Sequence, residues 1–325
     1  MLTSTHLRRL MWFECLFLFA IAYCFPRVAF AQNSQANQWI AFNRAGAANS
    51  NLQCFKPSNV SVTGGYLILT TRVESATCSS IDLPLGAFPY TSAFVSMRTF
   101  NFLYGTVEFR AKFGGGDHSG AWPTVWMLDS SCQASDPTGT DDACNGQEID
   151  IAEVLDGNFR QVNQQIHVDN FAHNEGCSAP VSDTSQNFHT YQLVWSSRSL
   201  VFKIDGISTC TLTGAYIPKS AMYVKISVYA GKSGGPIREE SLPWKTIVDY
   251  VKVTQGSSVL FSDEFDSEAT IEPARYVVVT PSPRRPSVRT VIVSAFDHWP
   301  AIALVLFSMI LVAIVAIRIR GSKQS

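Results

Sequence analysis

The chain has 325 residues, of which 46% are hydrophobic and only 16% charged, and its 25 basic and 26 acidic side chains leave a formal net charge of −1. Its 20 glycines and 15 prolines are too few for a collagen-like chain, and its apolar content is too high for a disordered one. A near-neutral chain also gives no electrostatic basis for binding nucleic acid.

The N-terminus has the order of features that is typical of a secretory signal. Arg8 and Arg9 precede an apolar stretch over residues 15–25, and a small-x-small site ends at Ala31. We therefore predict a signal peptide over residues 1–31, with an uncleaved signal anchor as the alternative. In either case the chain that follows is expected to be exported.

The C-terminus has the pattern of a membrane anchor. Residues 301–317 carry no charged side chain, Trp299 precedes them, and three basic side chains follow, at Arg318, Arg320 and Lys323. An uncharged stretch of this length is near the minimum that spans a bilayer, an indole suits the interface, and basic residues mark the cytoplasmic side. We predict a transmembrane helix over residues 299–318, with a buried core helix as the alternative.

These two ends divide the rest of the chain into three segments. Residues 32–270 are expected to form the exported domain, and residues 271–298 contain the run PSPRRP, which is typical of a stiff linker. Residues 319–325 are expected to form a short cytoplasmic tail. The predicted molecule is a single-pass membrane protein whose folded domain lies outside the cell.

The net charge is distributed unevenly among these segments. Residues 1–31 carry +2 and residues 271–325 carry +5, so residues 32–270 carry −8. An acidic exported domain disfavours nucleic acid and polyanions as partners and leaves neutral substrates open. We expect this domain to be monomeric.

Six cysteines lie in the exported domain, and an even number in such a domain predicts three disulfides. Sequential pairing closes the shortest loops and is the predicted connectivity, namely Cys54–Cys78, Cys132–Cys144 and Cys177–Cys210. A metal site is the alternative, but the domain has no Cys-x-x-Cys pair.

Short alternating and aromatic-rich runs recur along the exported domain, separated by breaks rich in glycine, serine, asparagine and proline. This pattern predicts an all-β sandwich or barrel. No long amphipathic helix and no internal repeat is evident in the sequence. The predicted strands cover residues 65–71, 104–113, 124–128, 148–154, 164–169, 190–195, 201–205, 223–229 and 247–254.

One predicted strand carries three acidic residues, in the run GQEIDIAEV over residues 146–154. Alternate residues of a strand share a face, so Glu148 and Asp150 point one way while Ile149 points into the core. Strict alternation would send Glu153 into the core, but a one-residue bulge after Asp150 returns it to the acidic face. We predict this bulge, and with it three carboxyl groups side by side.

Such a face suits the cleavage of glycosidic bonds. The side chains of Glu148 and Glu153 can lean toward each other until their carboxyl groups are about 5 Å apart, the separation found in retaining glycosidases. Repulsion among three acids favours one protonated and one ionised carboxyl group, as an acid and a nucleophile require. A solvated acidic face or a cation site is the alternative.

The run EIDIAE resembles the catalytic signature of glycoside hydrolase family 16 in its bulged, laminarinase-like form, Glu-x-Asp-x-x-Glu. Further runs resemble other strands of that family, and in order they cover about residues 50–255. They are LYGTVEFRAK (103–112), GAWPTVWML (120–128), FHTYQLVW (188–195), KIDG (203–206) and VDYVKV (248–253).

This resemblance implies a jelly-roll β-sandwich of two curved antiparallel sheets with a cleft on the concave face. It also implies cleavage of β-linked glucans or galactans by a retaining double displacement that requires no cofactor. By motif position, Glu148 resembles the nucleophile, Glu153 the acid/base, and Asp150 the helper between them.

Sugar binding is expected to rest on aromatic side chains, whose flat faces stack on pyranose rings. Trp122 is the first candidate, and Trp126 is the second, with a core position as its alternative. Arg98 resembles a substrate-binding arginine of the family, with a salt bridge at the rim as its alternative. His167 is expected on a neighbouring strand, within hydrogen-bonding reach of Glu153.

Other features carry less specific expectations. Asp249 resembles a position near a structural calcium ion in some relatives, with an ordinary strand-end aspartate as the alternative, and His189 is expected to pack and bond locally. Laminarinase-like members often carry a tryptophan shortly before the signature, but residues 144–147 read CNGQ, which weakens a claim of β-1,3 specificity. The run FSDEF (261–265) resembles a motif usually found near the family's N-terminus and indicates a rearranged edge.

We predict an endo-acting β-glucanase for β-1,3-linked or mixed β-1,3/1,4-linked glucan. A galactanase or a glycan transglycosylase of the same fold is the second candidate, and a non-catalytic glycan-binding sandwich is the third. The presence of both glutamates argues against the third. The expected partner is a neutral polysaccharide, β-glucan in the first case.

Overall fold

The computed structural model describes residues 38–46, 52–79, 86–135, 146–266 and 272–273. The predicted signal peptide, transmembrane helix and cytoplasmic tail lie outside these ranges, as does nearly all of the predicted linker, so export and membrane anchoring stay predictions. Within the described part of the chain, no helix combines the length and the apolar character needed to cross a membrane.

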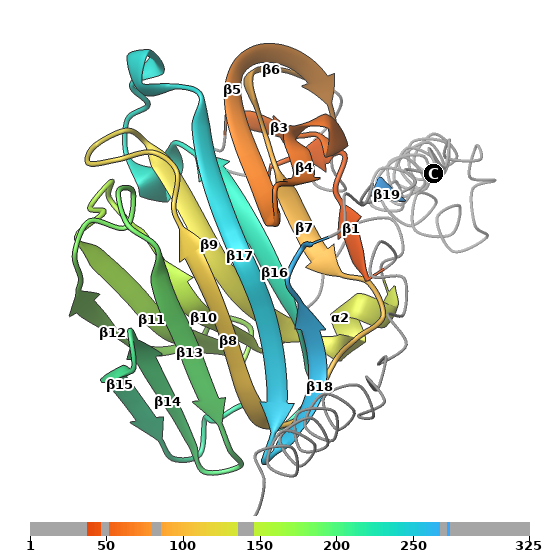
Figure 1. Cartoon of the computed structure of the whole chain (residues 1–325), viewed down its shortest axis with the longest axis vertical. Helices are drawn as coiled ribbons and strands as arrows, with labels where there is room; N and C mark the ends of the chain where they lie inside the picture. The colour runs from red at the N-terminus through yellow and green to blue at the C-terminus, as the bar shows by residue number, and fades with distance from the viewer. Residues whose placement is uncertain (1–37, 47–51, 80–85, 136–145, 267–271, 274–325) are drawn as a thin grey trace, which may run out of the picture. The chain divides into compact units, whose positions relative to one another are not determined.

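The described residues form two sheets packed face to face, and this confirms the predicted all-β sandwich (Figure 1). The first sheet has eight strands, in spatial order β12, β11, β10, β9, β16, β7, β1 and β19. In that order the strands cover His173–Pro180, Gln161–Val168, Glu148–Glu153, Ala121–Asp129, Met222–Ala230, Phe94–Met97, Trp39–Ala41 and Glu272–Pro273.

The second sheet has eleven strands, nine of them in the spatial order β15, β14, β13, β8, β17, β5, β6, β3 and β2. These nine cover Ile207–Thr213, Ser199–Ile204, His189–Trp195, Gly105–Lys112, Trp244–Gln255, Tyr66–Cys78, Gly86–Ser92, Gln53–Phe55 and Arg44–Ala45. In addition, β18 (Ser258–Asp263) pairs with β17, and β4 (Val60–Thr63) pairs with β5.

Helical structure is sparse in the described ranges. It comprises the α-helix α2 and three single-turn 3-10 helices, which cover Ser130–Ser135, Pro57–Asn59, Lys232–Gly234 and Glu239–Ser241. Each of the nine predicted strands corresponds to a strand of the structure.

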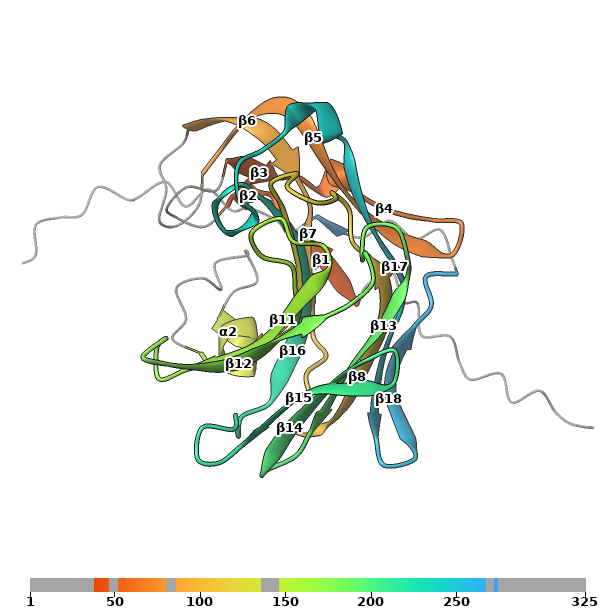
Figure 2. The ribbon, with the colours of Figure 1, turned by 90° about the vertical axis from the view of Figure 1, so that its left-hand side faces the viewer.

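Two strand pairs depart from the expected antiparallel arrangement of the sheets. The strand β3 pairs in parallel with β6, and β1 pairs in parallel with β19, whereas the other pairs are antiparallel. In both cases the two strands are far enough apart in sequence for the chain to return in the same direction. Figure 2 separates the two layers, with β11 and β12 on one side and β13, β17 and β18 on the other.

Alternating side chains build the core between the sheets. Tyr191, Leu193 and Trp195 of β13 are buried while the residues between them are half-buried, which is the period of two expected for a strand. The rings of Phe109 and Phe113 stack on Tyr191 with centroids 5.0 and 5.3 Å apart. All nine residues of β16 are buried, on both faces of the strand.

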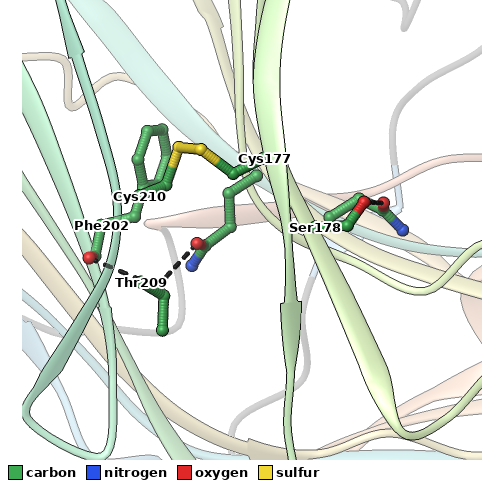
Figure 3. Close-up of a disulfide and its surroundings, with 7 residues drawn as sticks. Cys177, Ser178, Phe202, Thr209 and Cys210 are labelled. Carbon is green, nitrogen blue, oxygen red and sulfur yellow. Dashed lines mark hydrogen bonds between the residues drawn. A yellow bond between two sulfur atoms is a disulfide. The ribbon is translucent and has the colours of Figure 1, made fainter.

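Two of the predicted disulfides are present. Cys54–Cys78 joins β3 to β5 within the second sheet, and Cys177–Cys210 joins β12 of the first sheet to β15 of the second (Figure 3). Cys132 is also disulfide-bonded, but its predicted partner Cys144 lies outside the described residues.

Candidate active site

Strand β10 carries the three acidic residues and has the predicted bulge. Asp150 lies opposite Trp126 of β9, but the next paired residue is Ala152, opposite Val125. Ile151 is therefore the extra residue, and the register against β11 shifts at the same place. The bulge brings Glu153 back to the face of Glu148 and Asp150, so all three residues line one cleft.

The cleft has a volume of about 410 Å³ and lies on the first sheet. It is lined by residues of β9, β10, β11 and β16 and by segments next to these strands. The lining residues are Trp122, Thr124, Trp126, Leu128, Gly146, Glu148, Asp150, Glu153, Leu155, Gln165, His167, Phe171, Tyr229, Lys232 and Ser233.

Two donors hold the carboxyl group of Glu153, one on each oxygen. Trp122 Nε1 donates to Oε1 over 2.7 Å, and Gln165 Nε2 donates to Oε2 over 2.9 Å. The indole of Trp122 lies 4.6 Å from the ring of Tyr229, centroid to centroid. Since Glu153 is only 5% exposed, these contacts give its carboxyl group one orientation.

Burial is the main cause of a raised pKa at Glu153. The negative charge of Asp150 raises this pKa further, while the hydrogen bonds from Trp122 and Gln165 and the charge of His167 lower it, and the result is a pKa of about 8. Glu153 therefore keeps its proton at neutral pH, as a general acid must.

His167 faces Asp150 and Glu148, whereas we predicted that it would bond to Glu153. Its Nε2 lies 3.2 Å from Asp150 Oδ2 and 4.0 Å from Glu148 Oε1. The reason is the register, since His167 of β11 stands directly opposite Glu148, and Gln165 stands opposite Asp150, two residues nearer Glu153. Gln165 therefore takes the position that we had predicted for the histidine.

The charges around His167 determine its protonation. Burial lowers the pKa of this imidazole, but the bond to Asp150, the charge of Asp150, the bond to Asn174 and the charge of Glu148 outweigh it and raise the pKa to about 9. At neutral pH a cation therefore lies beside two carboxyl groups. This cation favours the ionised form of Glu148.

Burial raises the pKa of Glu148, as it raises that of Glu153. Burial, and next the charge of Asp150, raise its pKa well above 4.5, while the positive charges of His167 and Lys225 oppose that rise. One oxygen or nitrogen atom from each of Glu148, Asp150 and His167 lies within 4.8 Å of the others, a set that could hold a cation. A proton retained on His167 competes with that use of the set.

The two tryptophan candidates both line the cleft. Trp126 is only 7% exposed, its Nε1 donates to Ser227 Oγ over 3.1 Å, and Lys225 Nζ lies 4.2 Å from its ring centroid. Trp126 therefore forms part of the cleft floor, whereas the half-buried Trp122 also bonds to Glu153.

The remaining predicted residues lie elsewhere. Arg98 follows β7, is exposed and is not among the residues that line the cleft. Asp249 of β17 forms an ion pair with Arg110 over 2.6 Å, so its carboxyl group already has a cationic partner, and calcium at this position stays a prediction. His189 packs and bonds locally as expected, with Nδ1 2.7 Å from Asp205 Oδ2.

Three residues of the cleft region were not predicted from the sequence. Gln165 is two residues before His167, so the alternation of a strand would have placed it on the same face. Lys225 interrupts the apolar strand β16, and a charge in such a run is a signal of a special environment. Phe171 follows the end of β11, and the sequence pattern contains no signal for its position.

The comparison of sequence patterns identifies one family. The pattern of the family described as Glycosyl hydrolases family 16 matches residues 54–252, which include every acidic residue of the cleft. Among solved structures, the fold is similar to the catalytic domain of an endo-1,3-β-glucanase (laminarinase) from Thermotoga petrophila RKU-1, with a TM-score of 0.58 and 25% identity over 68% of this chain and 92% of that one.

Two curated proteins are related to this chain at a similar level of sequence identity. The chain is 26% identical to the endo-1,3-1,4-β-glycanase EglC of Rhizobium meliloti over 59% of this chain and 38% of that protein. It is also 26% identical to the clotting factor G α subunit of Tachypleus tridentatus over 66% of this chain and 31% of that protein. The chain thus spans about a third of the length of these relatives.

The family pattern covers more than half of the chain. The structure adds the two-sheet sandwich, the bulged carboxylate strand and a cleft that contains all three acids. The chain belongs to glycosyl hydrolases family 16.

Proposed function

We propose that this chain hydrolyses β-linked glucan by a retaining double displacement in the cleft of the first sheet. The observation that carries the proposal is the pair Glu148 and Glu153, which share one face of β10 in different surroundings. Glu153 is held by two donors and has a pKa of about 8, whereas Glu148 lies 4.0 Å from the cationic His167.

In the first step Glu148 attacks the anomeric carbon as its carboxylate, the form that the charges of His167 and Lys225 favour against burial and Asp150. The bond from this carbon to the leaving oxygen breaks, and the protonated Glu153 donates its proton to that oxygen. The products of this step are a covalent glycosyl ester on Glu148 and a free sugar end. In the second step the ionised Glu153 takes a proton from water, and the water oxygen attacks the anomeric carbon and releases Glu148.

Asp150 and His167 support both steps of this hydrolysis without bonding to the reacting carbon. The contact of 3.2 Å between them keeps the imidazole cationic, and the same imidazole lies next to the Glu148 carboxylate. The charge of Asp150 meanwhile raises the pKa of Glu153 and keeps its proton in place. Trp122 gives the acid its orientation and offers its ring to the substrate.

A β-1,3-linked or mixed β-1,3/1,4-linked glucan is the proposed substrate. The endo-1,3-β-glucanase and the endo-1,3-1,4-β-glycanase described above support this choice. An endo mode of action is part of the proposal. Activity on a galactan, and transfer to a second glycan in place of water, are the alternatives that the experiment separates.

The test compares reducing-sugar release from laminarin, lichenan and agarose by the wild type, Glu148→Gln and Glu153→Gln. We expect release from the two glucans by the wild type and a loss of about 10³-fold or more in both variants, because each removes a group that takes part in bond cleavage. Proton NMR of the first product is expected to show the β-anomer.

Glu240→Gln, at an exposed position outside the cleft, is the control and should hydrolyse like the wild type. Release from agarose alone would favour the galactanase, and longer products than substrates would indicate transfer. No release from any of the three glycans by the wild type would contradict the proposal.

A further inference from the structure

Phe171 stands out among the aromatic residues that line the cleft because its ring is open to solvent. It is 51% exposed, whereas Trp126 is 7% and Tyr229 8% exposed. It lies in the turn between β11 and β12, beside the strand that carries His167. A large apolar ring at the rim of a cleft offers a flat surface to a ligand.

The structure holds this ring in a defined position. It packs against the imidazole of His167, with centroids 4.9 Å apart and planes tilted by 35°. Asn174 Nδ2 donates to the backbone oxygen of Phe171 over 3.2 Å, and Asn174 Oδ1 accepts a hydrogen bond from His167 Nδ1. Since His167 Nε2 contacts Asp150, one chain of contacts joins the ring to the catalytic strand.

The backbone of the turn is unusual. Asp169, Asn170 and Phe171 all have positive φ values, of 53°, 57° and 61°. Aspartate and asparagine tolerate this left-handed conformation, but a bulky aromatic residue seldom adopts it. The contacts with His167 and Asn174 therefore keep Phe171 in a conformation that its side chain alone disfavours.

The opposite part of the same sheet offers no comparable surface in the described residues. Phe94 of β7 and Phe42 stack with centroids 4.3 Å apart, and they are 0% and 2% exposed. The guanidinium of Arg44 lies over both rings, at 5.2 Å from Phe42 and 5.3 Å from Phe94. Among the aromatic residues that line the cleft, the exposed ring is thus that of Phe171, on the side of β11 and β12.

We propose that Phe171 is a specificity-determining residue of the cleft, whose ring stacks on one sugar unit of the bound glucan beyond the catalytic carboxyl groups, on the side of β11 and β12. The apolar face of a pyranose ring, with its axial C–H bonds, matches the aromatic face, while the sugar hydroxyl groups stay in water. This inference rests on the proposed function for the identity of the ligand.

The test uses Phe171→Ala, Phe171→Gly and Phe171→Trp. Glycine adopts the positive φ of this position without strain, so Phe171→Gly removes the ring without straining the backbone of the turn. Tryptophan keeps a flat ring and should restore binding. Tyr216→Ala is the matched control, because Tyr216 is 45% exposed but does not line the cleft.

Two measurements are made on each variant with laminari-oligosaccharides of three to seven units. The first is hydrolysis, as KM and kcat, and the second is binding by calorimetry to the same variants in a Glu148→Gln background. We expect both ring-free variants to raise KM and Kd for the longer oligosaccharides about tenfold, which corresponds to about 1.4 kcal/mol. The kcat should stay within about twofold, since the ring does not contact the reacting bond.

The alkaline limb of the pH profile separates stacking from a structural role. A ring that only positioned His167 would shift this limb when removed, whereas a ring that stacks on sugar leaves it unchanged. Unaltered KM and Kd in Phe171→Gly, or a lack of rescue by tryptophan, would overturn the inference even if the wild type hydrolyses glucan. A wild type that binds but does not hydrolyse would contradict the proposed function alone, because the binding series still tests the ring.

Discussion

The buried carboxyl group of Glu153 illustrates how a single residue links function to stability. Its pKa is about 8 in the folded protein and 4.5 in an unfolded chain. Between these two values the unfolded chain releases a proton that the folded chain retains, so the stability from this group is complete below pH 4.5 and is lost as the pH rises through about 8. The raised pKa values of Glu148 and His167 act in the same direction.

We therefore expect Glu153→Gln to be inactive and yet to gain stability relative to the wild type as the pH rises. Glutamine cannot ionise in the unfolded chain, but its amide N–H replaces one of the two oxygens that accept from Trp122 and Gln165, so the Tm of the variant relative to the wild type should be lower at pH 4.5 than at pH 8. A change of about 3 °C or more in this Tm difference is expected, since ~1 kcal/mol shifts the Tm of a domain of this size by ~2–4 °C.

Scanning calorimetry at the two pH values provides the measurement, with the exposed Glu240→Gln as its control. A difference in Tm between Glu153→Gln and the wild type that is the same at pH 4.5 and pH 8 would show that Glu153 does not hold a raised pKa.

At the level of the element, the bulge in β10 decides which face each carboxyl group occupies. If the same residues followed strict alternation without a bulge, Glu153 would point toward the core. The core itself sets the register, because Ile149 and Ile151 are both fully buried. The bulge is thus held by apolar contacts on one face and displays the acids on the other.

Two single-residue deletions in β10 should have opposite effects on folding. Deleting Ala152 converts the bulged run to a regular one, in which alternation still places Glu148, Asp150 and Glu153 on one face. We expect this variant to fold but to lose about 100-fold or more in hydrolysis, because Glu153 moves away from its two donors. Deleting Ile149 should abolish the fold, since it turns Glu148 toward the core.

Near-UV circular dichroism and reducing-sugar release measure the two outcomes. Equal folding of the two deletion variants would show that the register of β10 is not held by its apolar face.

At the level of the whole molecule, two kinds of bond tie the edges of the sheets together. The disulfide Cys177–Cys210 joins β12 to β15, and Thr209 Oγ1 donates to Gln164 Oε1 over 2.7 Å, from β15 to β11 (Figure 3). By contrast, Cys54–Cys78 lies within one sheet. The disulfide Cys177–Cys210 therefore supports β12, the neighbour of the strand β11 that carries His167 and Gln165, whereas Cys54–Cys78 does not.

Replacing either pair of cysteines with serine should destabilise the protein by a similar amount. The bridges span 33 and 24 residues, and loops of this size contribute about 3–4 kcal/mol to the free energy of unfolding. We expect faster hydrogen exchange in β11 and β12 only after the loss of Cys177–Cys210. Hydrogen exchange with mass spectrometry, with the Cys54/Cys78 variant as the control, provides the test, and equal protection of these strands in both variants would contradict it.

Long strands with a regular pattern were predictable from the sequence, and short ones were not. The alternation in residues 190–195 is strong enough to predict β13, but β1, β2 and β3 have only two or three residues each, which is too few for a pattern. The pairing of Asp263 in β18 with Trp39, whose Nε1 donates to its carboxylate over 2.9 Å, joins the two ends of the described domain. The sequence predicted a rearranged edge in this region but not this contact.

The sequence by itself determined the acidic face, because Glu148, Asp150 and Glu153 lie within six residues of one strand, where local geometry decides their direction. Only the tertiary structure decided which groups surround them. Gln165, His167 and Trp122 come from neighbouring strands, and their partners depend on the register between strands, which residues far apart in the chain set together. For the same reason the raised pKa values, which arise from burial among these neighbours, appear only in the folded protein.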